Sequence, residues 1–290
     1  MKTIDPKSIP VGKLFGLLTG AVTPRPIAFA STIDKAGNVN LSPFSFFNVF
    51  GANPPTFVFS ASRRVRDNTT KHTLENVLEV PEVAINMVDF SMVQQMSLAS
   101  TEYEKGVNEF IKSGFTEQPS EKIKPPRVKE SPVSFECIVK QVIPTGDGGG
   151  AGNLIICEAV LIHCKDDIFD NEGNIDPVKM DAVSRLGKNW YSHVNEASLF
   201  EVEKPLSKTG IGVDAIPEKI RNSEVLTGND LGKLGNIEAF PSKQEIEDFY
   251  KKHGGKSMNS EISQHLYAHQ LLAENRVSDA WKVLLLNNLD

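Results

Sequence analysis

A small group of basic side chains is the feature of this sequence best suited to holding a charged ligand. The group consists of Arg63, Arg64, Arg66 and Lys71. It lies beside a helix predicted for residues 67–78, with Asn68, Thr69 or Thr70 as the N-cap. The free N–H groups and dipole of such a helix start favour an anion, for example one phosphate. A capped helix in water is the alternative, and these residues alone favour it.

A segment just upstream combines flat apolar side chains with short hydrogen-bonding ones. Ser42, Ser45 and Asn48 are interleaved there with Phe44, Phe46 and Phe47. A flat heteroaromatic ligand would use both kinds of surface. Arg25, held extended between two prolines, is suited equally to a ligand edge and to a surface ion pair.

The elements that must position these residues are predicted to be mainly strands. Residues 27–33 alternate with period 2, and residues 34–38 supply the turn of a hairpin. Further strands are predicted at 56–60, 82–88, 132–143 and 154–164, with a short helix at 89–99 and a polar connection at 109–130. Residues 9–20 form a weakly amphipathic segment ahead of the first strand.

A glycine-rich run from Pro144 to Asn153 lies between two of these strands. Residues 146–151 match the spacing G-x-G-x-x-A, but the dinucleotide-binding motif must open a helix, and here a strand follows. The run is therefore predicted to be a mobile hairpin loop at the rim of a site.

The last third of the chain has a different character. Helices are predicted at about 243–253, 261–275 and 278–289, the last two as a helical hairpin, whereas 211–222 and 226–241 read as a compact segment and a connection. His265 and His269 lie four apart on one helix face, but Leu266 stands where a zincin has glutamate. No metal site is predicted.

Composition excludes several classes of protein. The 290 residues carry a net charge of -6 with a pI near 5.6, which argues against a nucleic-acid surface. The N-terminus has no apolar signal region, and no apolar run approaches the roughly 20 residues needed to span a membrane. Cys137, Cys157 and Cys164 lack metal or redox spacing. We therefore predict a cytoplasmic protein with cysteines packed in its core.

No set of residues has the spacing of a catalytic centre. The sequence lacks a Gly-x-Ser-x-Gly elbow, a phosphate-binding Walker loop and a recognisable Cys/His pair. No catalytic residue is predicted, and an enzyme with this sequence would rely on the chemistry of a bound cofactor.

Several segments together resemble the FMN-binding split-barrel proteins of the flavin reductase-like family, which include the flavoredoxins. They are Thr-Pro-Arg-Pro-Ile-Ala-Phe-Ala-Ser-Thr at 23–32, Asn-Leu-Ser-Pro-Phe-Ser-Phe-Phe-Asn at 40–48, Asn-Pro-Pro at 53–55 and Lys-His-Thr-Leu-Glu-Asn at 71–76. Arg-Leu-Gly at 185–187 and Tyr191 extend the resemblance, which covers about residues 10–195.

The resemblance implies a mainly β fold with peripheral helices, a Greek-key split β-barrel at 1–198, followed by a largely helical extension at 199–290. It also implies a homodimer with FMN near the dimer interface. The residues carried over to FMN are Ser31 and Thr32 along the flavin, Ser45, Phe46, Phe47 and Asn48 facing the ring largely through backbone groups, and Ser62, Arg64, Lys71 and Thr73 at the phosphate. His72 departs from the family, which usually has aspartate there; a protonated histidine would suit a phosphate.

The activity implied is that of an NAD(P)H-dependent flavin reductase, with a hydride passing from nicotinamide C4 to flavin N5. An FMN electron carrier reduced by a protein partner is the main alternative. A binding protein that has kept the fold without the cofactor is a weaker one.

Overall fold

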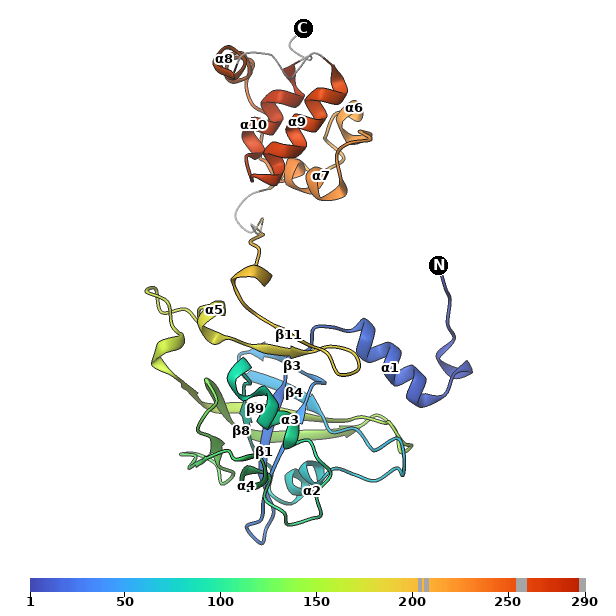
Figure 1. Cartoon of the computed structure of the whole chain (residues 1–290), viewed down its shortest axis with the longest axis vertical. Helices are drawn as coiled ribbons and strands as arrows, with labels where there is room; N and C mark the ends of the chain where they lie inside the picture. Colours follow the sequence, from blue (N-terminus) through green and yellow to red (C-terminus); the bar gives the residue numbers. More distant parts are fainter. Residues whose placement is uncertain (203–204, 206–208, 254–259, 287–290) are drawn as a thin grey trace. The chain divides into compact units, whose positions relative to one another are not determined.

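The computed structural model describes residues 1–202, 205, 209–253 and 260–286, in two compact units, Met1–Phe200 and Glu201–Asp290 (Figure 1). The sequence-based boundary lay between residues 198 and 199. Each unit has its own buried core.

One seven-stranded antiparallel sheet forms the centre of the first unit, in the order β2-β1-β5-β8-β9-β4-β3. Its strands are β1 (Ala28–Ile33), β2 (Val39–Phe44), β3 (Phe47–Ala52), β4 (Pro55–Ser60), β5 (Glu82–Asn86), β8 (Val133–Pro144) and β9 (Asn153–Cys164). The predicted strands are all present. The short pair β6 (Glu117–Gln118) and β7 (Arg127–Val128) lies within the segment expected to be a plain connection.

The two edges of this sheet are consecutive in the chain. Only Ser45 and Phe46 separate β2 from β3, so the chain passes there from one edge of the sheet to the other. Ser60 N–H donates to the carbonyl of Phe46 at 2.8 Å. Register shifts in the β8–β9 pair allow these long strands to bend. The sheet is thus curled into a barrel that is split at Ser45–Phe46, and the predicted split-barrel fold is confirmed.

Strand β1 is buried on both faces because helices cover the side that points away from the barrel interior. Ala28 and Ala30 belong to the interior core, with Phe59 and Ile155. Phe29 and Ile27 point to the other face and pack under 3-10 helix η2 (Phe90–Met92), α3 (Val93–Leu98) and α4 (Glu109–Ser113). This packing on both faces holds β1 in place, and most of the predicted FMN residues come after β1 in the chain.

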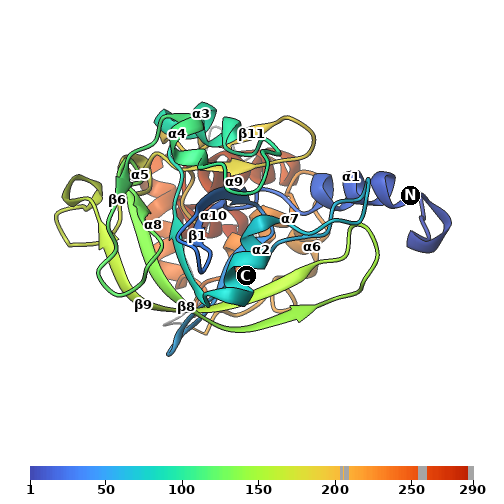
Figure 2. The ribbon, with the colours of Figure 1, turned by 90° about the horizontal axis from the view of Figure 1, so that it is seen from below.

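Helices α1 (Val11–Ala21) and α2 (His72–Glu79) flank the split. Figure 2 shows α2 within the curve of the β8–β9 hairpin, where Leu74 and Val77 join the interior core. The prediction for α2 began too early, because residues 67–71 form a loop with Asn68 at a φ of 59°. Lys71, without a side-chain cap bond, is the N-cap.

The remaining elements of the first unit are α5 (Pro177–Met180), the hairpin β10 (Val183–Arg185) and β11 (Tyr191–His193), and three short 3-10 turns, η1 (Pro6–Ser8), η3 (Asp166–Ile168) and η4 (Glu196–Ser198). A backbone bridge between Arg25 and Arg185 ties the β10–β11 hairpin to the chain just ahead of β1. Cys137 and Cys157 are buried in the barrel core, as predicted, and burial raises the pKa of Cys137 to about 12.

The second unit contains helices α6 (Glu218–Arg221), α7 (Gly228–Gly235), α8 (Lys243–His253), α9 (Glu261–Ala273) and α10 (Val277–Leu284) around the buried Trp281. The last three were predicted, although residues 287–289 of the final prediction lie outside the described residues. Helix α7 was missed within a supposed connection. Its Thr227–Asp230 capping box was the sequence signal for it.

Candidate functional site

Three neighbouring hollows surround the split of the barrel. The seam cavity, about 330 Å³, lies beside Ser45 and Phe46. The cation hollow is small, about 20 Å³, and lies around Lys71 and Thr73. The hairpin cavity, about 600 Å³, lies between α3 and the β10–β11 hairpin. Lys71 lines the first two, and Ser45, Pro43 and Arg185 line both the seam and the hairpin cavities.

The seam cavity offers one flat apolar surface and several hydroxyl groups. The Phe46 ring meets Phe15 of α1 edge to face, with centroids 5.9 Å apart. Ser45, Ser60 and Ser62 also line the cavity. Ser60 Oγ is buried and has no hydrogen-bond partner among the described residues. A polar ligand in this cavity would supply the partner that Ser60 lacks.

Arg25 organises the wall of the seam cavity rather than offering it a free charge. Its buried guanidinium donates to the carbonyls of Thr19, Val22 and Leu186, and its Nε lies 3.4 Å from Ser45 Oγ. Burial, and then the charge of Arg185, lower the pKa of Arg25. These bonds join the end of α1, the barrel split and the β10–β11 hairpin, so Arg25 is buried in the cavity wall and is not a surface ion pair.

Lys71 is a cation that lines both the seam cavity and the cation hollow. Its side chain is half-buried and has no ion pair or hydrogen bond within the part of the chain that the structure describes. Burial lowers the pKa of Lys71, and Arg64 lowers it further while Glu102 opposes them. Since the N–H groups of His72 and Thr73 at the start of α2 have no intrahelical carbonyl, charge and N–H donors converge where an anion would be stabilised.

The neighbouring arginines are already paired. Arg64 donates to Glu102 at 3.0 Å, to Thr69 Oγ1 at 2.9 Å and to the carbonyl of Thr70. Glu102 also accepts from the exposed Arg66 at 3.0 Å. Arg63 donates twice to Asn68, at 2.6 Å each. These arginines stiffen the loop before α2, and the predicted caps Asn68, Thr69 and Thr70 are used as their partners.

A buried relay stands behind the cation hollow. The Thr73 hydroxyl donates to Asn40 Oδ1 at 2.7 Å, and Asn40 Nδ2 donates to Glu109 Oε1 at 2.9 Å. The other oxygen of Glu109 accepts from Leu41 N–H at 2.9 Å. Burial raises the pKa of Glu109, against the lowering effect of these hydrogen bonds. Because its one proton is committed to Asn40, the Thr73 hydroxyl can only accept from a ligand.

Sequence reasoning missed Glu109 because it lies 69 residues from Asn40, in a segment expected to be a connection. A protonated His72 would suit a phosphate, but its surroundings oppose that charge. Burial lowers the pKa of His72, which favours the neutral ring.

The glycine-rich loop after β8 packs on the loop that carries the arginines. Gly150 N–H donates to the carbonyl of Arg63 at 3.0 Å, and Asn68 Nδ2 donates to the carbonyl of Asp147 at 2.9 Å. A Cβ at Gly149 would lie 3.0 Å from the Val65 carbonyl oxygen. The loop is therefore held against the arginine-bearing loop, where its glycines allow two backbones to approach closely.

Six of the predicted FMN residues line the two hollows, and the side chains of the other four lie elsewhere. Ser45, Phe46, Ser62 and Lys71 line the seam cavity, and Arg64, Lys71 and Thr73 line the cation hollow. Ser31 and Thr32 are fully buried, and Thr32 Oγ1 accepts from Asn76 at 3.2 Å. Phe47 stacks on Phe57 in the core, and Asn48 is exposed on β3.

The paired histidines of the second unit have other partners. His265 Nδ1 lies 2.7 Å from Ser223 Oγ, and His269 Nδ1 lies 2.9 Å from Asp230 Oδ2. Within the described ranges, no three His, Cys, Asp or Glu residues are grouped to hold a metal ion. No helix there is long and apolar enough to cross a membrane.

The family follows from a match to the first unit. A family model described as the flavin reductase like domain matches residues 20–178, more than half of the chain. This chain belongs to the flavin reductase-like family. Residues 20–178 of this flavin reductase-like chain include the whole barrel and all ten predicted FMN residues.

Known relatives match over a length close to that of the first unit. An uncharacterized protein of Aquifex aeolicus is 42% identical over 178 residues, 61% of this chain and 88% of the relative. An uncharacterized protein of Halalkalibacterium halodurans is 38% identical over 204 residues, 70% of this chain and 96% of the relative. Both matches leave uncovered a stretch about as long as the second unit.

Solved structures share the barrel. Nitrilotriacetate monooxygenase component B from Bacillus cereus is 30% identical with a TM-score of 0.65, covering 70% of this chain and 98% of that one. The 2-nitrobenzoate 2-nitroreductase of Pseudomonas fluorescens is 26% identical with a TM-score of 0.61, covering 72% and 100%. The flavoredoxin of Desulfovibrio vulgaris, 20% identical with a TM-score of 0.54, covers 64% and 93% and shares the fold.

Proposed function

We propose that this chain is an FMN-binding oxidoreductase whose flavin is reduced by NADH or NADPH. The observation that carries the proposal is Lys71, a half-buried cation with no side-chain partner among the described residues, at the start of α2 and in the wall shared by the seam cavity and the cation hollow. A flavin with a phosphate tail needs a flat polar site joined to an anion site, and these two hollows meet at this side chain.

The described residues fit that ligand. Lys71, Ser62 and the first N–H groups of α2 would hold the phosphate, with Arg64 adding charge while it stays bonded to Glu102. Thr73 would contribute its backbone N–H, since its hydroxyl proton is committed to Asn40. Ser45 and Phe46 would lie along the ring, and the unpartnered Ser60 Oγ would gain a hydrogen bond.

The buried or outlying residues would act indirectly. Ser31 and Thr32 lie in β1 behind the site, and Phe47 anchors the start of β3. When bound, FMN supplies a ring that accepts a hydride from nicotinamide and passes electrons on. The protein's part is to hold that ring against Phe46, to fix its polar edge with hydroxyl groups and to keep one face open to the second reactant.

Two further parts of the proposal concern partners and location. A homodimer is supported by the exposed side chains of Val49 and Phe50 on β3, an edge strand of the sheet in the single chain. Asn48 on the same strand would reach a flavin only at such an interface. The names of the nitrilotriacetate monooxygenase component and the nitroreductase support an oxidoreductase. The three free cysteines support a reducing, cytoplasmic location.

The test is the visible spectrum of the purified protein, followed by anaerobic addition of NADH and then NADPH. Flavin bands that bleach within seconds establish the reductase and identify its donor. Bands that persist with both nucleotides, but bleach with a reduced carrier protein, would replace the proposal with an FMN electron carrier. A protein that takes up no FMN, even when it is supplied in excess, would overturn the cofactor assignment.

A further inference from the structure

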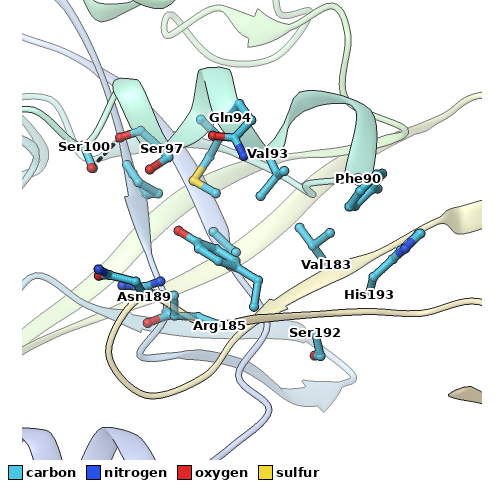
Figure 3. Close-up of a pocket in the computed structure, with 15 residues that line it drawn as sticks. Phe90, Val93, Gln94, Ser97, Ser100, Val183, Arg185, Asn189, Ser192 and His193 are labelled. Carbon is cyan, nitrogen blue, oxygen red and sulfur yellow. Dashed lines mark hydrogen bonds between the residues drawn. The ribbon is translucent and has the colours of Figure 1, made fainter.

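The hairpin cavity, at about 600 Å³, is the largest of the three hollows, and the function proposed above does not place FMN in it. Its lining comes from 3-10 helix η2 and α3 on one side and from β10, β11 and their connection on the other. Figure 3 shows Val93, Gln94 and Ser97 of α3 on one side of the cavity and Arg185 and Asn189 on the other. At about 600 Å³, it is within the usual range of small-molecule sites.

The charge of the cavity is positive and uncompensated. None of the described residues that line it is an aspartate or a glutamate. The Arg185 guanidinium has no ion pair or hydrogen bond from its side chain among the described residues. Asp181, outside the lining, is engaged with His193 at 2.5 Å. An anion entering the cavity would therefore meet a free guanidinium and no competing carboxylate.

The aromatic side chains of the cavity leave the N–H edge of the Arg185 guanidinium free to bind a ligand. Arg185 lies over the ring of Tyr191, with its Cζ 4.5 Å from the ring centroid. Stacking uses the face of a guanidinium, so its N–H edge can still bind a carboxylate through two parallel hydrogen bonds. The Phe90 ring stacks on the His193 ring, with centroids 4.2 Å apart. Val93, Met96 and Val183 add apolar side chains to the cavity wall. A flat ring would find contact there.

We propose that the hairpin cavity binds a planar aromatic carboxylate, with the carboxylate on Arg185 and the ring between α3 and the hairpin. One unpaired arginine matches the single charge of a carboxylate. The two phosphates of a dinucleotide would require more charge or a glycine-rich helix start, and the cavity lining has neither.

The position of the cavity gives this ligand a role. Pro43, Ser45 and Arg185 line both the hairpin cavity and the seam cavity, so a ring in one would lie next to a ring in the other. If FMN occupies the seam cavity, as proposed above, aromatic carboxylates are the substrate class of the oxidoreductase. That assignment rests on the proposed function, whereas binding of the carboxylate does not.

The test measures binding of benzoate to the full-length protein by titration calorimetry, with the flavin content of each sample recorded. Benzamide has the same shape without the charge, and cyclohexanecarboxylate has the charge without the flat ring. Benzoate is expected to bind saturably and about tenfold or more tighter than either analogue, because a charged hydrogen-bonded pair and ring stacking are each lost in one of them.

Two variants locate the site. R185Q should weaken benzoate binding about tenfold to a hundredfold and leave the weak binding of benzamide unchanged. S97F places a ring in the cavity from α3 and should abolish benzoate binding. R221Q, in the second unit, removes a guanidinium that donates to the carbonyl of Asp214 and is the matched control. Benzoate binding that is absent in the wild type, or unchanged in both R185Q and S97F, would overturn the proposal.

The titration also separates this inference from the proposed function. Saturable benzoate binding to a protein that takes up no FMN would support the cavity assignment while overturning the cofactor. In FMN-loaded protein, benzoate should shift the flavin bands in the wild type and in R221Q, and not in S97F. Benzoate that binds to the loaded protein without any shift would overturn the adjacent position of the two ligands.

Discussion

The cation hollow and the hairpin cavity share strand β2 and its end, yet differ in how far their polar groups are satisfied. Asn40 and Ser42 line the hollow, and Pro43 and Ser45 line the cavity, as expected for alternate residues of a strand. In the hollow, Arg64, Thr73, Asn40 and Glu109 are all hydrogen-bonded. In the cavity, Arg185 has no polar partner among the described residues.

This difference suggests two kinds of binding. The side chains of the hollow are already held by hydrogen bonds, so binding an anion there would cost little conformational entropy. Among the described residues of the hollow, the Lys71 side chain has no polar partner, and the first N–H groups of α2 have no intrahelical carbonyl. The hairpin cavity leaves its one strong cation free, which suits a ligand that enters and leaves. A ligand that stays bound at the cation hollow and one that exchanges at the hairpin cavity would correspond to a resident cofactor and its substrate.

The strongest way to break the comparison is to remove the carboxylate behind the hollow. E109A would leave Leu41 N–H and Asn40 Nδ2 without their acceptor, at a cost of about 3 kcal/mol in the free energy of unfolding. Urea unfolding followed by tryptophan fluorescence and circular dichroism measures it. FMN affinity should fall as well, because Asn40 and Thr73 lose their fixed orientation.

A conservative variant separates these two effects. E109Q keeps the volume and one acceptor, but its NH₂ group cannot accept from Asn40. We expect about half the loss of stability and a weaker FMN affinity. If E109Q binds FMN as the wild type does, the relay holds the fold together without positioning the anion site.

The next largest effect is expected at Lys71. K71A should weaken FMN binding by about 2 kcal/mol, roughly thirtyfold, because a cation without a partner among the described residues is removed from beside the phosphate. R64A should weaken FMN binding less, since the Arg64 guanidinium already donates to Glu102, Thr69 and Thr70. Fluorescence titration with FMN measures both. Wild-type affinity in both variants would refute the phosphate assignment.

The pH dependence of FMN affinity sharpens the same point. Burial and Arg64 lower the pKa of Lys71 below its ordinary 10.5. The charged form, which attracts the phosphate, is present below that lowered pKa and is lost as pH rises through it. Affinity should therefore decline above neutrality at a lower pH than an ordinary lysine would give. K71R should move the decline to higher pH, because a guanidinium remains charged. An identical profile in K71R would assign the decline to another group.

A feature of the fold or of the site could be predicted from the sequence when residues close together in the chain determine it. Strand β1 was predictable because alternation along residues 27–33 is a local pattern. The loop before α2 was not, because Thr69 and Thr70 are good helix caps that the Arg64 side chain uses instead. The relay from Thr73 to Glu109 depends on residues 33 and 69 apart, which no local pattern encodes.

The predicted site residues show the same division. Lys71 and Ser45 could be placed by resemblance, and the structure does bring them to one cavity. Arg185 was noted only as part of a motif, because its lack of a partner is a property of the folded surroundings. The freedom of a charged group cannot be read from its neighbours in sequence.

The smallest effect, and the most local, is expected in the glycine-rich loop. A Cβ at Gly149 would lie 3.0 Å from the Val65 carbonyl oxygen and 3.2 Å from that of Arg64, so G149A must push the two backbones apart. We expect a loss of about 1 kcal/mol in stability, with a weaker FMN affinity because the displaced backbone carries Arg64.

The neighbouring glycine provides the matched control. A Cβ at Gly148 meets nothing within 4 Å, and its φ does not require glycine, so G148A should be neutral or slightly stabilising. Equal FMN affinity in G149A and G148A would mean that the loop only covers the rim. A loss of FMN affinity in G149A but not in G148A would show that the glycine-rich loop helps to position Arg64. The hydrogen-bonded surroundings of the cation hollow would then extend from Glu109 through Arg64 to that loop. The hairpin cavity has no such support for Arg185 among the described residues.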